Sequence, residues 1–324
     1  MTRRLLIATL LVTAVSTQMG EAYLRISPII DGRRLFFQVS PPSLRIVVSD
    51  QGVPGVSPAQ MQAAITRAGE TWQAVPSSAF VFQSVGITSA QPGVMDGQNT
   101  IGFVSDLDDP DLLGLTLIIF DAVTGDIVEA DVAFNNTFEW SVAENGEEDK
   151  FDFESVALHE LGHMLGLGHS GLAQMETGRV AAAETAMFPI SYDAGTIAGR
   201  QLRADDIAGA SLIYPDGGFL SDTGTLSGRV ELTGRPVFGA HIMAFNPGTG
   251  TMVGGFTYEN GEFLISGLSP GAYILRVEPI DDGDTSSFFD EVVDVSFKTM
   301  FLNRLVTVQR GTTTPRVDIV VEPK

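Results

Sequence analysis

The sequence predicts two domains of different fold class: an α+β domain with a mixed sheet covered by helices, followed by a small all-β sandwich. Three observations support this prediction. Apolar residues recur at helical spacing in several stretches before residue 215, whereas short alternating runs separated by turn residues fill the chain after residue 224. The length of 324 residues also favours two domains over one. We therefore expect an α+β domain over 44–215, a linker over 216–224 and a sandwich over 225–324.

Composition excludes several classes of function. The chain has 19 Lys+Arg against 40 Asp+Glu, and its net charge of −21 argues against a nucleic-acid partner, which needs a basic surface. A hydrophobic fraction of 44% is too high for a disordered chain. The absence of cysteine excludes disulfides, thiol nucleophiles and cysteine-ligated zinc. Any metal site must therefore use histidine and carboxylate ligands.

The first 22 residues have the pattern of an export signal. Arg3 and Arg4 precede an apolar run over 5–15, and the small residues Gly20 and Ala22 follow. This run is shorter than the roughly 20 residues that a membrane span needs, so no membrane span is expected. We expect cleavage after Ala22 and a secreted, extracellular protein of bacterial type.

The elements of the first domain follow from local patterns. Residues 23–43 are predicted to be an N-terminal extension or a short pro-segment. Ser57 and Pro58 are typical of a helix start, and Gly166 is typical of a helix end. The predicted elements are, in order, a strand at 44–49, a helix at 58–72, strands at 80–85 and 100–104, a hairpin of 112–120 and 127–134, a helix at 152–165, an irregular segment at 168–200 and a helix at 204–213.

The second domain shows about seven short β-type runs. Asn260-Gly261 between two alternating runs predicts a tight hairpin. The domain has one histidine, His241, for which we expect a structural role because no partner lies at ligand spacing. The pattern predicts a sandwich without a catalytic site of its own.

One motif carries chemistry. Residues 159–170 have the sequence His-Glu-Leu-Gly-His-Met-Leu-Gly-Leu-Gly-His-Ser. His159 and His163 lie four residues apart on one helix face, and the turn at Gly166 brings His169 to the same cation. Three imidazoles leave one zinc position for water, as in catalytic zinc sites. The motif predicts peptide-bond hydrolysis by a zinc-activated water, with Glu160 as the general base.

The sequence around this motif resembles the metzincin metallopeptidases, most closely the matrixin branch that includes matrix metalloproteinases. Ser170 follows the third histidine as in matrixins, and Ala186-Met187-Phe188-Pro189 is similar to their Met-turn. The resemblance covers about 44–215, with further similar segments at 131–140 and 202–214. It implies the metzincin fold, a twisted mixed five-stranded sheet with three helices. It also implies one catalytic zinc with Met187 beneath it, and an edge strand at 112–120 that binds an extended protein or peptide substrate.

Three departures from the matrixin pattern change the expectation. Ala133 occupies a position where matrixins have a ligand of a second, structural zinc, and no histidine precedes residue 159, so we expect no second zinc. The chain has no cysteine that could hold a pro-segment on the catalytic zinc. Tyr192 lies one residue farther from Met187 than is usual, which leaves its role in the specificity pocket open.

Acidic clusters could bind structural Ca²⁺, as in many matrixins, or could be solvated loops. Neither the first nor the second cluster has a known calcium-loop spacing. The two alternatives are about equal for the first cluster, and the solvated loop is favoured for the second. A third acidic run in the second domain is equally ambiguous. The three groups are Asp106, Asp108, Asp109 and Asp111; Glu144, Glu147, Glu148 and Asp149; and Asp281, Asp282 and Asp284.

The second domain resembles the carboxypeptidase regulatory-like domain, a transthyretin-like sandwich, over 225 to about 280. Its similar segments include 228–232, 236–240, 260–263 and 267–273. The resemblance implies an accessory module that could contact a cell surface or a glycan. An alternative function is therefore a non-catalytic secreted binding or adhesion protein, in which the zinc domain is a scaffold. An enzyme of the same fold that acts on a small amide is a third option, and the oligomeric state stays open.

Overall fold

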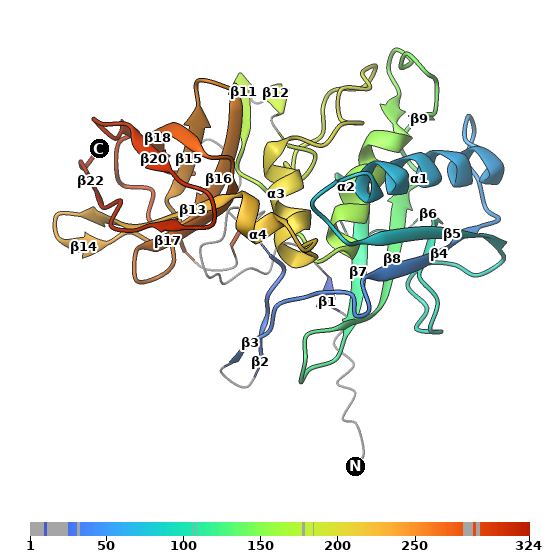
Figure 1. Ribbon diagram of the computed structural model, residues 1–324. Coiled ribbons are helices and arrows are strands. Elements are labelled where there is room, and N and C mark those ends of the chain that lie inside the picture. Colours follow the sequence, from blue (N-terminus) through green and yellow to red (C-terminus); the bar gives the residue numbers. More distant parts are fainter. Residues whose placement is uncertain are drawn as a thin grey trace.

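The computed structural model describes residues 10–11, 25–30, 33–105, 107, 109–176, 179–183, 185–280, 288–289 and 292–324. Figure 1 shows two bodies joined by helices. One body contains a sheet with α1 (Pro58–Gln73) and α2 (Phe153–Met164), and the other is the sandwich. Between them lie α3 (Ala204–Ile213) and the short α4 (Phe219–Asp222). The predicted order of an α+β domain and a β-rich domain is confirmed.

Among the residues that the structure describes, the sheet of the first body has six strands. Its inner strands β8, β6 and β4 run parallel, whereas β7 pairs antiparallel with β8 near one edge. In spatial order the strands are β1 (Leu10–Leu11), β7 (Gly114–Phe120), β8 (Ile127–Asn135), β6 (Thr100–Val104), β4 (Ser43–Ser49) and β5 (Val81–Thr88). Five of these strands, β4 to β8, come from the predicted peptidase domain, in line with the expected five; the sixth, β1, lies within the predicted signal and pairs with β7. An edge strand presents unpaired backbone groups that another segment can satisfy in this way.

The two main helices cover one face of this sheet (Figure 1). Ser57 caps α1 in a capping box with Gln60, and Asp152 caps α2 by accepting the Ser155 N–H. Trp72 of α1 is fully buried, and its indole N–H donates to the Leu158 carbonyl of α2 over 2.8 Å. This contact fixes the position of α2 beneath α1.

The described part of the N-terminal extension belongs to the body of the first domain. Phe37 has no exposed surface, and its ring centroid lies 4.5 Å from that of Phe120 in β7. The Val39 N–H donates to the Tyr214 hydroxyl over 2.8 Å, and the Ile127 N–H donates to the Gln38 carbonyl over 2.7 Å. Within this extension, β2 (Ile29–Ile30) pairs with β3 (Arg33–Arg34).

Two segments differ from the expectation of irregular structure. The segment at 168–200 contains a hairpin of β11 (Ala173–Glu176) and β12 (Arg179–Ala183). The predicted linker contains α4, and its Phe219 is buried. The ring packs closely on Gly267 of the sandwich, where an added Cβ would lie only 3.1 Å from it. Upstream of α2, the short β9 (Trp140–Ser141) and β10 (Phe151–Asp152) pair in parallel.

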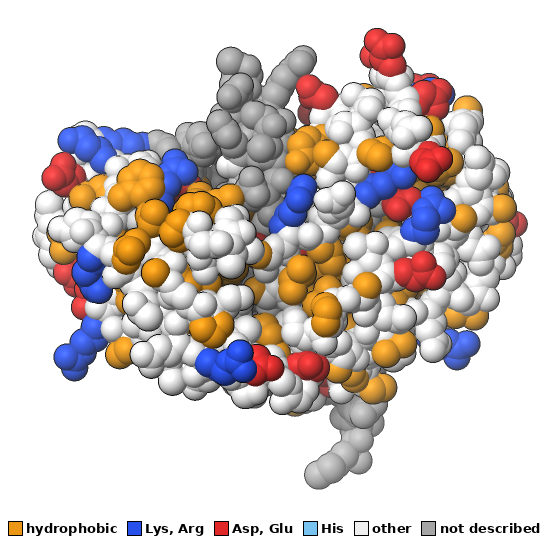
Figure 2. Space-filling model, turned by 45° about the horizontal axis from the view of Figure 1, so that its top comes forward, with side chains coloured by type: hydrophobic (Ala, Val, Ile, Leu, Met, Phe, Trp, Pro, Cys, Tyr) orange, Lys and Arg blue, Asp and Glu red, His pale blue; other side chains and the backbone are white. Residues whose placement is uncertain are grey.

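In the described residues of the second body, the strands form two sheets of five strands each. The first contains β13 (Gly224–Leu232), β14 (Arg235–Pro236), β17 (Glu262–Leu268), β21 (Thr313–Thr314) and β22 (Ile319–Val321). The second contains β15 (His241–Asn246), β16 (Thr251–Phe256), β18 (Gly271–Glu278), β19 (Met300–Phe301) and β20 (Val306–Val308). Hydrophobic side chains gather on the sandwich side of the face in Figure 2.

Candidate metal centre

Helix α2 presents two imidazoles on one face. The His159 Nδ1–H donates to the Ala186 carbonyl over 2.8 Å, and the His163 Nδ1–H donates to the Leu167 carbonyl over 2.8 Å. Since a carbonyl only accepts, both protons lie on Nδ1, and each Nε2 keeps its lone pair. The two Nε2 atoms are 3.1 Å apart. Both rings are therefore held in the tautomer and orientation that suit a shared cation.

The third imidazole comes from the loop that follows α2. Gly166 has a φ of +94°, and the chain leaves the helix there, which places His169 beside the other two rings. One ligand atom from each of the three histidines lies within 4.8 Å of the others. Tetrahedral zinc with Zn–N bonds of about 2.0–2.1 Å places its nitrogens about 3.3 Å apart, so the donors fit this metal.

Burial keeps the helix imidazoles neutral. Desolvation lowers the pKa of His159, and desolvation together with the neighbouring histidines lowers the pKa of His163 well below its usual value. A neutral imidazole is the form that binds a metal. These two donors therefore need no deprotonation before binding at neutral pH.

Glu160 lies in the same cavity wall as the three histidines. Burial raises the pKa of this carboxyl to about 7, while a hydrogen bond from Thr116 lowers it. The Thr116 hydroxyl donates to Glu160 Oε2 over 2.7 Å from the edge strand β7. A Cβ on Gly114 would lie 2.8 Å from Glu160 Oε1, so only glycine leaves room for the carboxylate there. A carboxylate with this pKa is suited to proton transfer near neutral pH.

The turn at Met187 packs against the helix that carries His159 and His163. A Cβ on Gly162 of α2 would lie 2.2 Å from Met187 Sδ, which shows how closely this methionine packs beneath the helix. Asp206 of α3 accepts the backbone N–H groups of Ala186 and Met187 over 2.8 and 3.1 Å. Because the Ala186 carbonyl orients His159, Asp206 supports that ligand indirectly.

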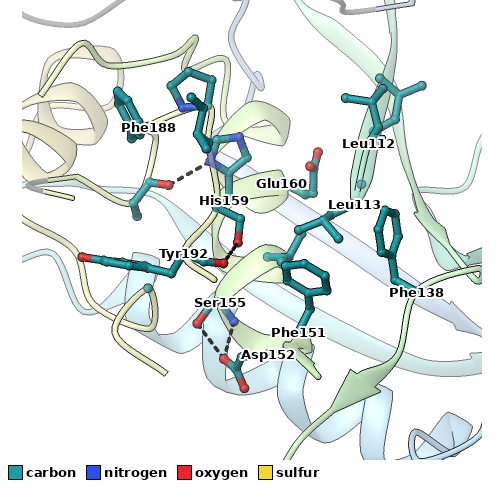
Figure 3. Close-up of a pocket in the computed structure, with 18 of the residues that line it drawn as sticks. Leu112, Leu113, Phe138, Phe151, Asp152, Ser155, His159, Glu160, Phe188 and Tyr192 are labelled. Atoms are coloured by element: carbon teal, nitrogen blue, oxygen red, sulfur yellow. Dashed lines mark hydrogen bonds between the residues drawn. The ribbon is translucent and has the colours of Figure 1, made fainter. Parts of the chain in front are cut away.

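A cavity of about 550 Å³ opens in front of the cluster. Figure 3 shows Phe138, Phe151 and Leu113 on one side of it, and Tyr192 and Phe188 on the other. Tyr192 therefore lies in the cavity wall despite its shifted spacing. The segment 112–116 lines the cavity, and β1 pairs only with the more distant Leu117 and Ile118 of β7.

The predicted calcium clusters form no metal-binding group among the residues that the structure describes. Asp106, Asp108, Asp281, Asp282 and Asp284 lie outside those residues. Asp109 and Asp111 line the cavity, and the Asp109 carboxylate accepts the Asp111 N–H over 3.0 Å. Glu147 forms an ion pair with Lys150. Calcium binding stays a prediction.

Three more residues concern the site or its surroundings: His241, Thr116 and Asp205. His241 is buried, and its Nδ1 lies 3.1 Å from Glu278 Oε1, consistent with a structural role. Sequence patterns did not identify Thr116 or Asp205, which contact Glu160 and Ser170. A polar Thr116 inside an apolar strand was the one available signal for the first of these.

Comparison with known proteins places this geometry in a family. The matrixin family matches residues 43–215, and the carboxypeptidase regulatory-like domain matches residues 225–322, which confirms both resemblances. No curated protein matches the chain.

Two solved structures show only a remote similarity. The minor pilin GBS52 of Streptococcus agalactiae is 16% identical over 32% of this chain and 46% of its own, with a TM-score of 0.23. The TIE protein of Bacillus anthracis is 18% identical over 32% of this chain and 17% of its own, with a TM-score of 0.21. The chain thus spans less than half the length of either structure. Because the matrixin match spans more than half of its 324 residues, the chain belongs to the matrixin family and carries a zinc metallopeptidase-type domain.

Proposed function

We propose that this protein is a secreted zinc-dependent endopeptidase that hydrolyses peptide bonds in extended polypeptides. His159, His163 and His169 would hold the zinc, and Glu160 would act as general base. The observation that carries the proposal is the buried Glu160 carboxylate beside three converging imidazoles in one cavity. A purely structural zinc site has four protein ligands and needs no base.

The chain's own residues supply binding and proton transfer. When bound, the zinc supplies Lewis acidity that polarises the substrate carbonyl and makes water more acidic. Glu160 accepts a proton from the attacking water and delivers it to the leaving amide nitrogen, so the peptide bond breaks without a covalent enzyme intermediate. The Thr116 hydroxyl holds the Glu160 carboxylate in position for both transfers.

The cavity favours an extended substrate with an apolar side chain. The backbone at 112–116 borders the cavity, and an extended peptide can add to such an edge by main-chain hydrogen bonds. The aromatic walls of Phe138, Phe151 and Tyr192 suit an apolar side chain next to the cut bond.

Export and the domain boundaries are part of the same proposal. The pattern of residues 1–22 supports a signal that is removed from the mature enzyme. No described helix is long and apolar enough to cross a membrane. We propose a peptidase domain over 44–215 and an accessory sandwich over 225–324 that could contact a cell surface or a glycan; Figure 2 shows hydrophobic patches on its side of the molecule.

The test is cleavage of a pool of unstructured peptides by residues 23–324, compared with Glu160→Gln at equal measured zinc content. We expect wild type to cut internal bonds and Glu160→Gln to lose about 10²- to 10⁴-fold in rate, because the general base is gone. Glu154→Gln is the matched control, since Glu154 lies on the same helix in an ion pair with Arg67 and outside the cavity wall. It should keep wild-type cleavage.

The alternative outcome is equally clear. If wild type and both variants bind zinc and none cuts a peptide, the endopeptidase proposal fails. The non-catalytic binding or adhesion protein would then be the better description, with the sandwich as its functional part.

A further inference from the structure

The loop that carries His169 lies directly against the sandwich. A Cβ on Gly171 would lie 2.9 Å from the Phe256 ring and 3.1 Å from the His241 ring. A Cβ on Gly254 of β16 would lie 3.1 Å from Leu172 Cγ, and Leu172 is 1% exposed. The two domains therefore pack so closely here that neither glycine has room for a methyl group unless a neighbouring side chain moves.

A single carboxylate joins this loop to the sandwich. Asp205 lies in the first turn of α3 and is 1% exposed. The Ser170 hydroxyl donates to Asp205 Oδ2 over 2.6 Å, and the Gly254 N–H donates to Asp205 Oδ1 over 2.9 Å. Both oxygens are thus used, one by the residue after the third histidine and one by the backbone of the other domain. Hydrogen bonds between buried groups are electrostatically stronger than the same bonds in water.

The sandwich also contacts His169 itself, which lies outside helix α2. His159 and His163 are fixed by helix α2 and by carbonyls that accept their Nδ1–H groups. His169 lies beyond the helix end, and its ring centroid is 6.3 Å from that of Phe288 of the sandwich. Phe288 in turn packs 5.6 Å from Phe256 of β16. The sandwich therefore contacts both the ring and the backbone neighbours of this histidine.

We propose that Asp205 is a positioning residue of the metal centre, and that the sandwich, through Gly254, is part of the scaffold that holds His169. This inference rests on the proposed zinc site but not on the proposed peptidase activity. It assigns the carboxypeptidase regulatory-like domain a role in metal binding, in addition to any external contact. Residues that hold a metal ligand in place commonly change metal affinity about 10- to 100-fold when they are removed.

The experiment perturbs the contact from each side in the full-length mature chain. Asp205→Ala removes the bridge, and Asp205→Asn keeps an acceptor for the Gly254 N–H. Gly254→Ala adds a Cβ that would lie 2.8 Å from His241 Nε2 and 3.1 Å from Leu172 Cγ, so it perturbs the contact from the sandwich side and the whole peptidase domain stays wild type in sequence. The zinc Kd is measured by competition with a chromophoric chelator, and the visible spectrum of the Co²⁺-substituted protein reports ligand geometry. Thermal unfolding of the metal-free protein is followed in parallel.

Two matched controls separate metal positioning from general stability. Ser211 lies on the same helix and is fully buried, and its hydroxyl bonds to the Ile207 carbonyl and to the Ser77 hydroxyl, so the control Ser211→Ala removes contacts away from the metal centre. Val253 lies next to Gly254 on β16, packs in the core and pairs with Ala244 of β15, so Val253→Ala is the control on the sandwich side. Both should lower the Tm and leave the zinc Kd and the Co²⁺ spectrum unchanged.

We expect Asp205→Ala and Gly254→Ala to weaken zinc binding about 10- to 100-fold and to alter the Co²⁺ spectrum, with Asp205→Asn closer to wild type. Wild-type zinc affinity in both variants, with a Tm lowered as in the controls, would overturn the inference. If Asp205→Ala does not fold, Ser170→Ala removes one hydroxyl of the same bridge and decides the question with Gly254→Ala. A wild-type protein that binds zinc but cuts no peptide refutes the proposed activity and leaves this inference standing.

Discussion

The hydrogen bond between Thr116 and the proposed general base gives a prediction that can be worked through in numbers. Thr116→Val replaces a hydroxyl by a methyl group of similar shape at a position that is 1% exposed. The change removes the donor that lies 2.7 Å from Glu160 Oε2 and leaves the three histidines untouched. The same hydroxyl lies 3.1 Å from the Glu160 backbone carbonyl, so the effect should fall on Glu160.

The expected magnitude follows from the charge on the acceptor. A hydrogen bond to a charged group contributes about 1.5–3 kcal/mol. Its loss destabilises the ionised form of Glu160, and about 1.4 kcal/mol corresponds to one pKa unit. The pKa of Glu160, already raised to about 7 by burial, should therefore rise by about 1–2 units. Since the ionised form is the base, kcat/KM at acidic pH should fall by about 10- to 100-fold.

The assay is kcat/KM for an internally quenched peptide, measured between pH 5.5 and 9.5 at equal zinc content. The acid limb of the Thr116→Val profile should move to higher pH, and its activity should approach that of wild type at the alkaline end. Thr116→Ser keeps the hydroxyl and should keep the wild-type limb. If Thr116→Val lowers kcat/KM equally at every pH, or if Thr116→Ser lowers it as much, the proposed role of the Thr116 hydroxyl in setting the pKa of Glu160 is refuted.

Three further predictions concern stability and metal binding. Phe37→Ala should lower the free energy of unfolding by about 3–5 kcal/mol in urea titrations, because Phe37 is fully buried; activation without loss of stability would instead support a removable pro-segment. Burial raises the pKa of Asp205 to about 8 from 3.8, so its contribution to the stability of the metal-free protein is present below pH 3.8 and lost as the pH rises through 8. Asp205→Asn should flatten that decline, and equal pH slopes for both proteins in urea titrations would contradict this sign. Removing zinc with a chelator should lower the Tm, since zinc at 1,000 times its Kd stabilises the folded state by about 4 kcal/mol; an unchanged Tm, with zinc removal verified by metal analysis, would argue against a site formed only in the folded state.

Patterns with a short period could be predicted from the sequence, and contacts between distant segments could not. The helix that carries His159 and His163 follows from the spacing of its apolar residues, and the motif itself predicts the turn at Gly166. The bridge from Ser170 through Asp205 to Gly254 joins three segments whose approach depends on how two domains pack. No local preference encodes such an approach.

The same limit applies to the strands and the linker. The hairpin of β11 and β12 and the short α4 lie in segments rich in small or turn-forming residues, which predict irregular structure. The pairing of Leu10–Leu11 with β7 depends on a strand whose residues lie more than 100 positions away in the sequence. In these places tertiary contacts override the local signal.

The buried Phe219 in the segment between the domains has a consequence for how such a chain can change during evolution. A flexible linker would let the C-terminal module be exchanged for another by recombination, with little effect on the peptidase domain. Here a crossover at 216–224 would also remove Gly267, on which both Phe219 and Ala208 pack. The Ala208 Cβ lies 2.8 Å from a Cβ placed on Gly267. The two domains should therefore be inherited as one unit, and substitutions on α3 should be compensated in β16 and β17.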